Sequence, residues 1–191
     1  MNKVLTVIER ARAFAIEAHT RINHRRKYSQ QPYSGHLAAV ASIVASVSED
    51  EEMIAAAWLH DVVEDTPATL YDVETALGKE VALLVENLTD VSKPSDGNRA
   101  TRKALDRQHT AAGSSRAKTV KLEDLIDNLQ DICKHDMRFA QTFLVEMGAT
   151  LEVLDTGNQQ LYQRAWKVYH RCQEKLRVHG AQATESSDEE K

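Results

Sequence analysis

Apolar residues recur at intervals of three and four along nearly the whole chain, the spacing that places them on one face of an α-helix. The first such run starts at Leu5 and Ile8, and we find no convincing strand pattern. The predicted helices cover about residues 3–20, 36–47, 51–64, 70–77, 79–88, 99–112, 115–134, 136–154 and 158–179. The pattern predicts an all-α protein, a single helical bundle of about eight to ten helices around one core.

Proline, glycine and capping residues set several of the predicted boundaries. Pro67 ends the helix over 51–64, because a proline cannot continue a helix. Thr69 and Asp72 have the spacing of a capping box, and Gly78 suits the position just after the short helix that follows. These signals make the short segment over 70–77 a helix of its own.

The net charge of the chain is −5, and residues 180–191 carry −3 of it. This segment is small, polar and acidic, which is typical of disorder, so we predict a domain over 1–179 and a disordered tail over 180–191. The remaining charge is small and neither favours nor excludes a nucleic-acid partner.

The length and composition suit a protein that folds around its own core. The chain has 191 residues, of which 42% are hydrophobic and 5% aromatic. A chain of this size buries roughly 70% of its unfolded surface and needs no disulfide to fold. Charged residues interrupt the first apolar run, unlike in a signal peptide, and no apolar run approaches the length of about 18 residues that spans a membrane.

The two cysteines, Cys133 and Cys172, form no CxxC pair. Their spacing fits neither a disulfide framework nor a thiolate zinc site. We therefore expect two reduced thiols in a cytoplasmic protein.

The residues that start at His60 read His-Asp-Val-Val-Glu-Asp-Thr and follow a long apolar stretch. On one continuous helix, His60 lies a turn from Glu64 and Asp61 lies a turn from Asp65, so all four fall within an arc of about 140°. Three carboxylates beside a histidine at the end of a buried helix crowd charge, and a divalent cation would compensate for it. A solvated acidic helix end fits the same spacing, so the segment alone leaves both interpretations open.

Further polar residues stand at helix positions elsewhere in the chain. His36 opens the predicted helix over 36–47, where a histidine is more often a cap or a surface residue. Asp124 and Asn128 lie one turn apart beside the apolar face of the predicted helix over 115–134. Taken singly, these residues would be ordinary solvated groups.

Together these residues resemble the HD phosphohydrolase superfamily, and within it the hydrolase domain of RelA/SpoT-type alarmone enzymes, above all the small stand-alone alarmone hydrolases. The resemblance covers about residues 5–175. An isolated His-Asp pair would be no signal, but the ordered set with HDxxED is specific. The matching strings are Arg25-Arg26-Lys27, Pro32-Tyr33, His36, His60-Asp61-x-x-Glu64-Asp65-Thr66, Gly78-Lys79-Glu80-Val81, Thr89-Asp90, Lys121-Leu122-x-Asp124-x-x-x-Asn128 and Gly157-Asn158.

The resemblance implies one divalent metal ion, usually manganese in this family. Its implied ligands are His36, His60, Asp61 and Asp124. Two imidazoles and two carboxylates leave two of six coordination positions for water or a substrate oxygen. The ion would polarise a phosphoryl oxygen and acidify a water molecule, which Glu64 and Asp65 would orient and deprotonate.

The resemblance also implies a reaction, the removal of pyrophosphate from the 3′ position of guanosine tetra- or pentaphosphate. Such a polyanionic nucleotide needs cations, and Arg26 and Lys27 match the family's Arg-Lys pair. Asn128 would position the sugar or a phosphate, and Arg138 resembles an arginine on a later substrate-facing helix. We expect this small molecule as the partner, rather than a nucleic acid or a membrane, and the pattern indicates no particular oligomeric state.

Some positions depart from the family pattern. They are Leu37, Leu125, Asp127, Gln130 and Thr142. None belongs to the metal set, but several belong to the implied substrate wall, so the chemistry is better specified than the substrate. Two alternatives stay open: an HD hydrolase for another phosphorylated nucleotide, such as an adenosine analogue or NADPH, and a catalytically weak helical binding module that senses a nucleotide.

Overall fold

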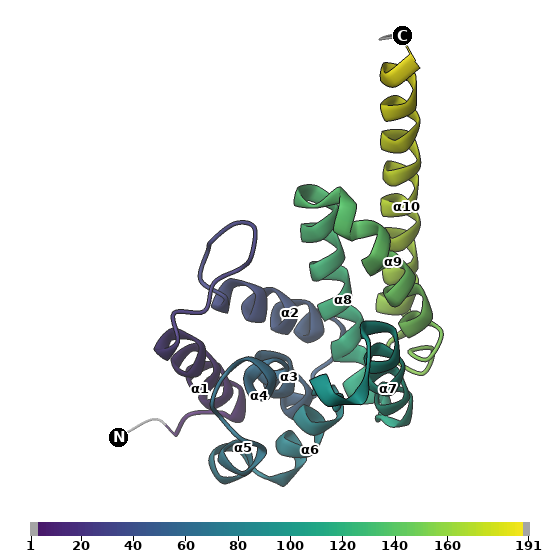
Figure 1. The fold of residues 1–191 in the computed structure, drawn as a ribbon. Coiled ribbons are helices and arrows are strands. Elements are labelled where there is room, and N and C mark those ends of the chain that lie inside the picture. The colour runs from purple at the N-terminus through teal and green to yellow at the C-terminus, as the bar shows by residue number, and fades with distance from the viewer. Residues whose placement is uncertain (1–3, 189–191) are drawn as a thin grey trace.

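The computed structural model describes the backbone of residues 4–188 and the side chains of residues 4–179. The described part is helical almost throughout (Figure 1), which confirms the predicted all-α class. Its helices are α1 (Val7–Arg21), α2 (Ser34–Val47), α3 (Glu51–Leu59), α4 (Val62–Asp65), α5 (Leu70–Leu77), α6 (Lys79–Leu88), the 3₁₀ helix η1 (Pro94–Asp96), α7 (Arg99–Ala112), α8 (Ser115–His135), α9 (Met137–Leu151) and α10 (Gln159–Asp188). Among the described residues there is no strand, and a single β-bridge joins Arg25 to Pro32.

Capping residues start and end several helices where the sequence predicts it. Thr69 and Asp72 form the expected capping box of α5, in which the Asp72 N–H donates to Thr69 Oγ1 at 3.2 Å. Gly78 separates α5 from α6 with a φ of 97°, a left-handed angle that favours glycine. Asn158 caps α10 with its Oδ1, which accepts the Leu161 N–H at 3.1 Å. These caps fix where each helix begins and so which side chains share a face.

The helix predicted over 51–64 is interrupted in the structure. α3 ends at Leu59 and α4 begins at Val62, and Asp61 between them has a φ of −102° and a ψ of 0°. These angles lie in the sparsely populated region next to the helical one. The Asp61 carbonyl accepts the Asp65 N–H at 2.9 Å, so helical hydrogen bonding resumes only in α4. The geometry of one continuous helix is therefore wrong for the HDxxED motif.

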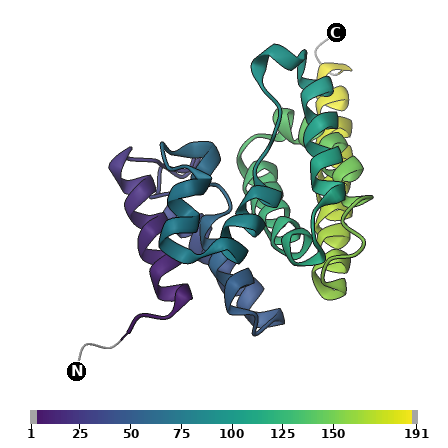
Figure 2. The same cartoon turned by 90° about the horizontal axis from the view of Figure 1, so that it is seen from below.

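α8 joins two groups of helices (Figures 1 and 2). It packs against α2, α3 and α6 on one side and against α9 and α10 on the other, while α7 lies against α6 and α9. The buried apolar residues form two clusters: the first ends on α8 at Val120, and the second begins there at Leu122. The expected single core is thus two adjacent clusters that share one helix.

The last helix is longer than the sequence predicts. The backbone stays helical to Asp188, where we expected an end near residue 179 and a disordered tail over 180–191. Figure 1 shows the C-terminal part of α10 projecting beyond the other helices. Residues 189–191 lie outside the described part, and the domain boundary at 179 stays a prediction. No helix in the part that the structure describes has both the length and the apolar character to cross a membrane.

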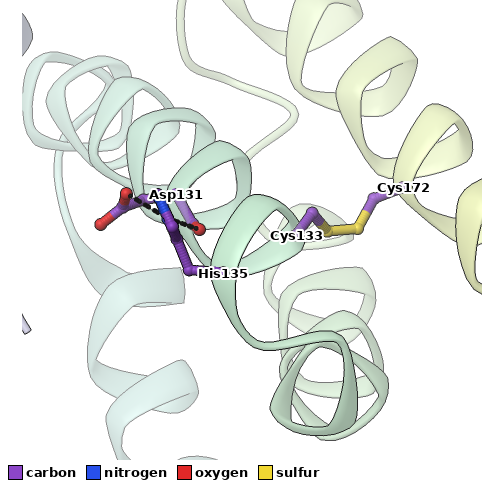
Figure 3. Close-up of a disulfide and its surroundings, with 4 residues drawn as sticks. All are labelled: Asp131, Cys133, His135 and Cys172. Atoms are coloured by element: carbon purple, nitrogen blue, oxygen red, sulfur yellow. Dashed lines mark hydrogen bonds and ion pairs between the residues drawn. A yellow bond between two sulfur atoms is a disulfide. The ribbon is translucent and has the colours of Figure 1, made fainter. Parts of the chain in front are cut away.

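A disulfide joins Cys133 to Cys172, which corrects the expectation of two reduced thiols. Cys133 lies near the end of α8 and Cys172 on α10, with their Cα atoms 6.2 Å apart (Figure 3). The pairing depends on the packing of α10 against α8, which a separation of 39 residues does not reveal. Figure 3 also shows Asp131 and His135 on the side of α8 that faces away from the disulfide.

Candidate metal centre and active-site cavity

Four polar side chains converge on one point between α2, α3, α4 and α8. The Nε2 atoms of His36 and His60 are 3.1 Å apart, and both side chains are buried. Asp61 Oδ2 lies 3.0 Å from His60 Nε2 and 3.6 Å from His36 Nε2. Asp124 Oδ1 lies 3.6 Å and 3.5 Å from the same two nitrogens. The structure therefore brings together all four residues of the predicted ligand set.

These separations suit the coordination sphere of a divalent ion. Metal–ligand bonds of about 2.1 Å place neighbouring ligand atoms roughly 3.0–3.4 Å apart. Two imidazole nitrogens and two carboxylate oxygens are ligands that divalent transition metals accept. Asp61 and Asp124 also line an open cavity, so the remaining coordination positions are accessible. The residues present fit a divalent metal ion.

The interruption between α3 and α4 makes this convergence possible. Adjacent residues of a regular helix point roughly 100° apart and do not face one another. Because Asp61 lies between the two helices, its carboxylate reaches the ring of the preceding residue, His60. The Tyr33 hydroxyl donates to the same Asp61 oxygen at 2.5 Å and holds it in place.

The charges of the cluster shift the pKa values of its members. Burial lowers the pKa of His36, but hydrogen bonds to Asp124 and its acidic neighbours raise it to about 11. Burial likewise opposes the charge of His60, whose pKa rises to about 9 next to Asp61 and Asp124. Burial would raise the pKa of both aspartates, yet His60 holds that of Asp61, and Lys121 that of Asp124, well below the usual range. The cluster therefore favours positive charge at its centre, which a cation would supply.

Glu64 and Asp65 on α4 line the same cavity. Glu64 Oε1 accepts the Asp90 N–H at 2.6 Å, which fixes this carboxylate beside the cluster. Both side chains are open to the cavity, but the protein around them partly excludes water. This burial raises the pKa of Glu64 to about 7 and, with the nearby charge of Asp61, that of Asp65 to about 6. A carboxylate that accepts a proton near neutral pH suits a general base.

The cavity has a volume of about 300 Å³ and lies between α4, α7, α8 and α9. Besides the acidic residues, its wall contains Arg99, Lys103 and Arg107 of α7. Phe139 and Phe143 of α9 contribute two aromatic rings with centroids 6.2 Å apart. Cations and rings in one cavity suit a ligand with both phosphates and a planar base.

The predicted substrate-binding residues do not all lie at the cavity. Asn128 lines the cavity, and its Nδ2 donates to Asp124 Oδ1 at 2.6 Å. Lys27 is exposed, with Nζ 5.3 Å from the centre of a phenylalanine ring of the cavity wall. Arg26 and Arg138 are not among the residues that line the cavity.

Arg26 is held by two acids of α8 instead. Its Nη1 donates to Asp127 Oδ2 at 2.5 Å, and its Nη2 donates to Asp131 Oδ2 at 3.0 Å. Together with Arg26 these acids line a separate, more open depression. Arg26 therefore attaches the segment between α1 and α2 to α8.

Several residues of the cavity carry no role in the sequence analysis. Tyr33 and Lys121 belong to the matched strings, and Lys121 Nζ lies 3.1 Å from Asp124 Oδ2. Phe139 and Phe143 stand four residues apart on a predicted helix, so their shared face was a detectable signal. Which cavity that face would line depends on the packing of α9, which the sequence does not show.

Comparison with known families adds an independent observation. A family model described as HD domain matches residues 11–146, well over half of the chain. The chain therefore belongs to the HD domain family. A divalent metal ion is implied for this domain, and the His/Asp cluster supplies residues that could hold it.

Several named proteins are similar to this chain in sequence. A Drosophila melanogaster protein named guanosine-3′,5′-bis(diphosphate) 3′-pyrophosphohydrolase MESH1 is 42% identical over 111 residues, which are 56% of this chain and 60% of that protein. The protein of the same name from Xenopus tropicalis is 34% identical over 134 residues, covering 69% of this chain and 73% of the relative. The bifunctional (p)ppGpp synthase/hydrolase SpoT of Escherichia coli is 43% identical over 86 residues, which are 45% of this chain and 12% of SpoT. The matched part of the chain thus spans less than two thirds of the Drosophila and Escherichia coli proteins.

Solved structures show the same architecture. A metazoan orthologue of SpoT, described as hydrolysing ppGpp, superposes with a TM-score of 0.78 at 28% identity, over 90% of this chain and 98% of that chain. A protein from Listeria monocytogenes superposes with a TM-score of 0.61 at 23% identity, over 74% of this chain and 97% of its own, and shares the fold.

Proposed function

We propose that this chain is a manganese-dependent hydrolase that removes the 3′-pyrophosphate from guanosine tetra- or pentaphosphate. The products are GDP or GTP and pyrophosphate. The observation that carries the proposal is the convergence of two buried histidines and two aspartates, and these aspartates line one cavity together with two carboxylates of raised pKa. The relatives named for this reaction support the same substrate.

The proposed chemistry divides between the metal ligands and the residues of α4. When bound, the divalent ion would polarise the phosphoryl group and acidify a water molecule. Glu64, held by the Asp90 N–H at 2.6 Å, orients that water and accepts its proton. Asp65 lies on the same short helix and is the second acceptor in reach of the cavity. His36, His60, Asp61 and Asp124 have the complementary role of holding the ion.

The residues of α7 and α9 that line the cavity suit a polyanionic nucleotide. Arg99 pairs with Glu146 at 2.5 Å and Lys103 with Asp90 at 2.6 Å, so both cations are already oriented at the cavity. A phosphate group would share or replace these carboxylate partners. Among the predicted substrate residues, we assign Asn128 and Lys27 to the nucleotide, since one lines the cavity and the other reaches its aromatic wall.

We also propose a cytoplasmic location and a small-molecule nucleotide as the partner, rather than a nucleic acid or a membrane. The Cys133–Cys172 disulfide is unusual for that compartment, where thiols are normally kept reduced.

The deciding experiment is turnover with manganese on guanosine tetraphosphate, guanosine pentaphosphate, their adenosine analogues and NADPH, with analysis of the products. We expect the guanosine compounds to release intact pyrophosphate. Stepwise release of orthophosphate would contradict the proposed reaction. Turnover restricted to NADPH or an adenosine analogue would reassign the substrate and leave the metal centre in place.

Two variants separate metal binding from catalysis in the same assay. Asp124→Ala should lose the metal ion and keep its helical circular dichroism. Glu64→Gln should keep the ion and lose about two to four decades in kcat, the range for a positioned general base. Glu74→Gln, on the exposed surface of α5, is the matched control and should turn over like the wild type. A Glu64→Gln variant with normal kcat would remove Glu64 from the mechanism.

A further inference from the structure

The metal-facing histidines are oriented by different partners. His60 Nδ1 lies 2.8 Å from the carbonyl oxygen of Ala57, three residues back on α3. His36 Nδ1 lies 2.7 Å from Asp127 Oδ2, a side chain 91 residues away on α8. A carbonyl or carboxylate oxygen only accepts, so each Nδ1 carries the proton and each Nε2 faces the cluster.

The contact between His36 and Asp127 is well protected. His36 is 1% exposed, and the Asp127 side chain is 22% exposed. The same Asp127 oxygen accepts from Arg26 Nη1 at 2.5 Å, so a cation compensates the carboxylate on its far side. Arg26 is itself anchored a second time, by Asp131 at 3.0 Å. The chain Arg26–Asp127–His36 therefore runs from the surface to the metal ligands.

We propose that Asp127 is the positioning residue of this metal centre, which selects the ring orientation of His36, and that Arg26 is its counter-ion. This inference rests on the proposed metal-dependent function. It assigns Arg26 to the support of a metal ligand instead of to the nucleotide. It also gives a role to Asp127, one of the positions at which the chain departs from the family pattern.

The physical reason lies in what the carboxylate does to the imidazole. An acceptor on one ring nitrogen makes the other a better ligand and removes the rotational freedom that binding would otherwise cost. Replacing such a partner typically weakens metal binding by about 10–100-fold. His60 needs no side chain for this purpose because a backbone carbonyl of α3 is its acceptor, whereas the acceptor of His36 Nδ1 is the side chain of Asp127.

The test is the dissociation constant of manganese, measured by titration calorimetry and by the electron paramagnetic resonance signal of free Mn²⁺. Asp127→Asn keeps the size of the side chain and removes its charge, and it should bind manganese about 10–100-fold more weakly. Asp131→Asn is the matched control, because it loses the same charge on the same helix and contacts Arg26 but not His36. It should bind manganese within about threefold of the wild type. Saturating manganese should restore the kcat of Asp127→Asn.

The outcomes distinguish this inference from the function on which it rests. Unchanged manganese affinity in Asp127→Asn, with tight binding by the wild type, would overturn the role of Asp127 alone. Equal losses in Asp127→Asn and Asp131→Asn would also overturn it, since they would indicate a general charge effect. A wild-type protein that binds no manganese would overturn the proposed metal centre itself. Circular dichroism of the metal-free variants verifies that each is folded.

Discussion

His19 should make the protein lose stability in mild acid. This residue of α1 is 2% exposed, and its Nδ1 lies 2.9 Å from His24 Nδ1. Its ring stacks on that of Tyr33, with centroids 5.1 Å apart. Burial, and then the positive charge on His24, lower the pKa of His19 from 6.5 to about 4. The folded protein therefore resists a proton that the unfolded chain accepts.

The sign and size of the effect follow from proton linkage. Because the folded-state pKa is depressed, the stability of neutral His19 is fully present above pH 6.5 and is lost as the pH falls toward 4. A pH of about 5 lies roughly 1.5 units below the pKa of 6.5 that the histidine has in the unfolded chain. At 1.36 kcal/mol per unit, protonation then stabilises the unfolded chain by about 2 kcal/mol. The loss is complete only below the folded-state pKa.

Urea unfolding of the metal-free protein at about pH 7.5 and pH 5 measures this loss. The drop in unfolding free energy between the two pH values should be about 2 kcal/mol smaller in His19→Gln than in the wild type. His170→Gln, an exposed histidine on α10, should show the wild-type drop. If His19→Gln and the wild type lost the same stability, then the burial of His19 would not oppose its protonation, and the reasoning would be refuted.

Two further substitutions test the packing of the second cluster. Cys172→Ala should cost about 4 kcal/mol of unfolding free energy relative to the oxidised protein, because the bond to Cys133 closes a loop over a separation of 39 residues, and dithiothreitol should abolish most of the difference. Gly157→Ala should cost about 1–3 kcal/mol in urea unfolding, since a Cβ there would meet Leu122 Cδ1 at 2.9 Å, whereas Gly35→Ala has open space and should cost nothing; equal effects would contradict the steric reasoning.

The sequence predicted most of the helices, and the family resemblance named the four side chains that converge, but neither predicted the geometry of the cluster. Helical spacing located His60 and Asp61 at the end of a buried helix, and it placed them on one continuous arc. In the structure the helix is interrupted at these two residues, and Asp61 has a ψ of 0°. The local sequence does not predict this break, because it contains no proline or glycine there. Only the tertiary contacts with Tyr33 and Asp124 give it a reason.

Contacts between distant parts of the chain explain the other differences. Asp127 was recognisable as a departure from the family, but its meeting with His36 depends on how α2 crosses α8. The same holds for Cys133 and Cys172, whose spacing lacks a signature and whose pairing follows from α8 against α10. An arginine such as Arg26 is typical of a phosphate contact, but its partners in the structure are two carboxylates on α8.

One face of α8 connects the chemistry of the cavity to the packing of the molecule. Lys121, Asp124 and Asn128 follow at intervals of three and four, and the outer two each contact Asp124. Asp127 and Asp131 stand one turn apart on a neighbouring face and hold Arg26. The other three proposed metal ligands lie on α2 and between α3 and α4, elements that contribute buried apolar residues to the first cluster, whereas α8 is shared by both clusters. A shift of α8 would therefore move Asp124, and also Asp127 as the partner of His36, relative to the other proposed ligands. Metal affinity and the packing of α8 on α2 and α3 thus depend on the same contacts.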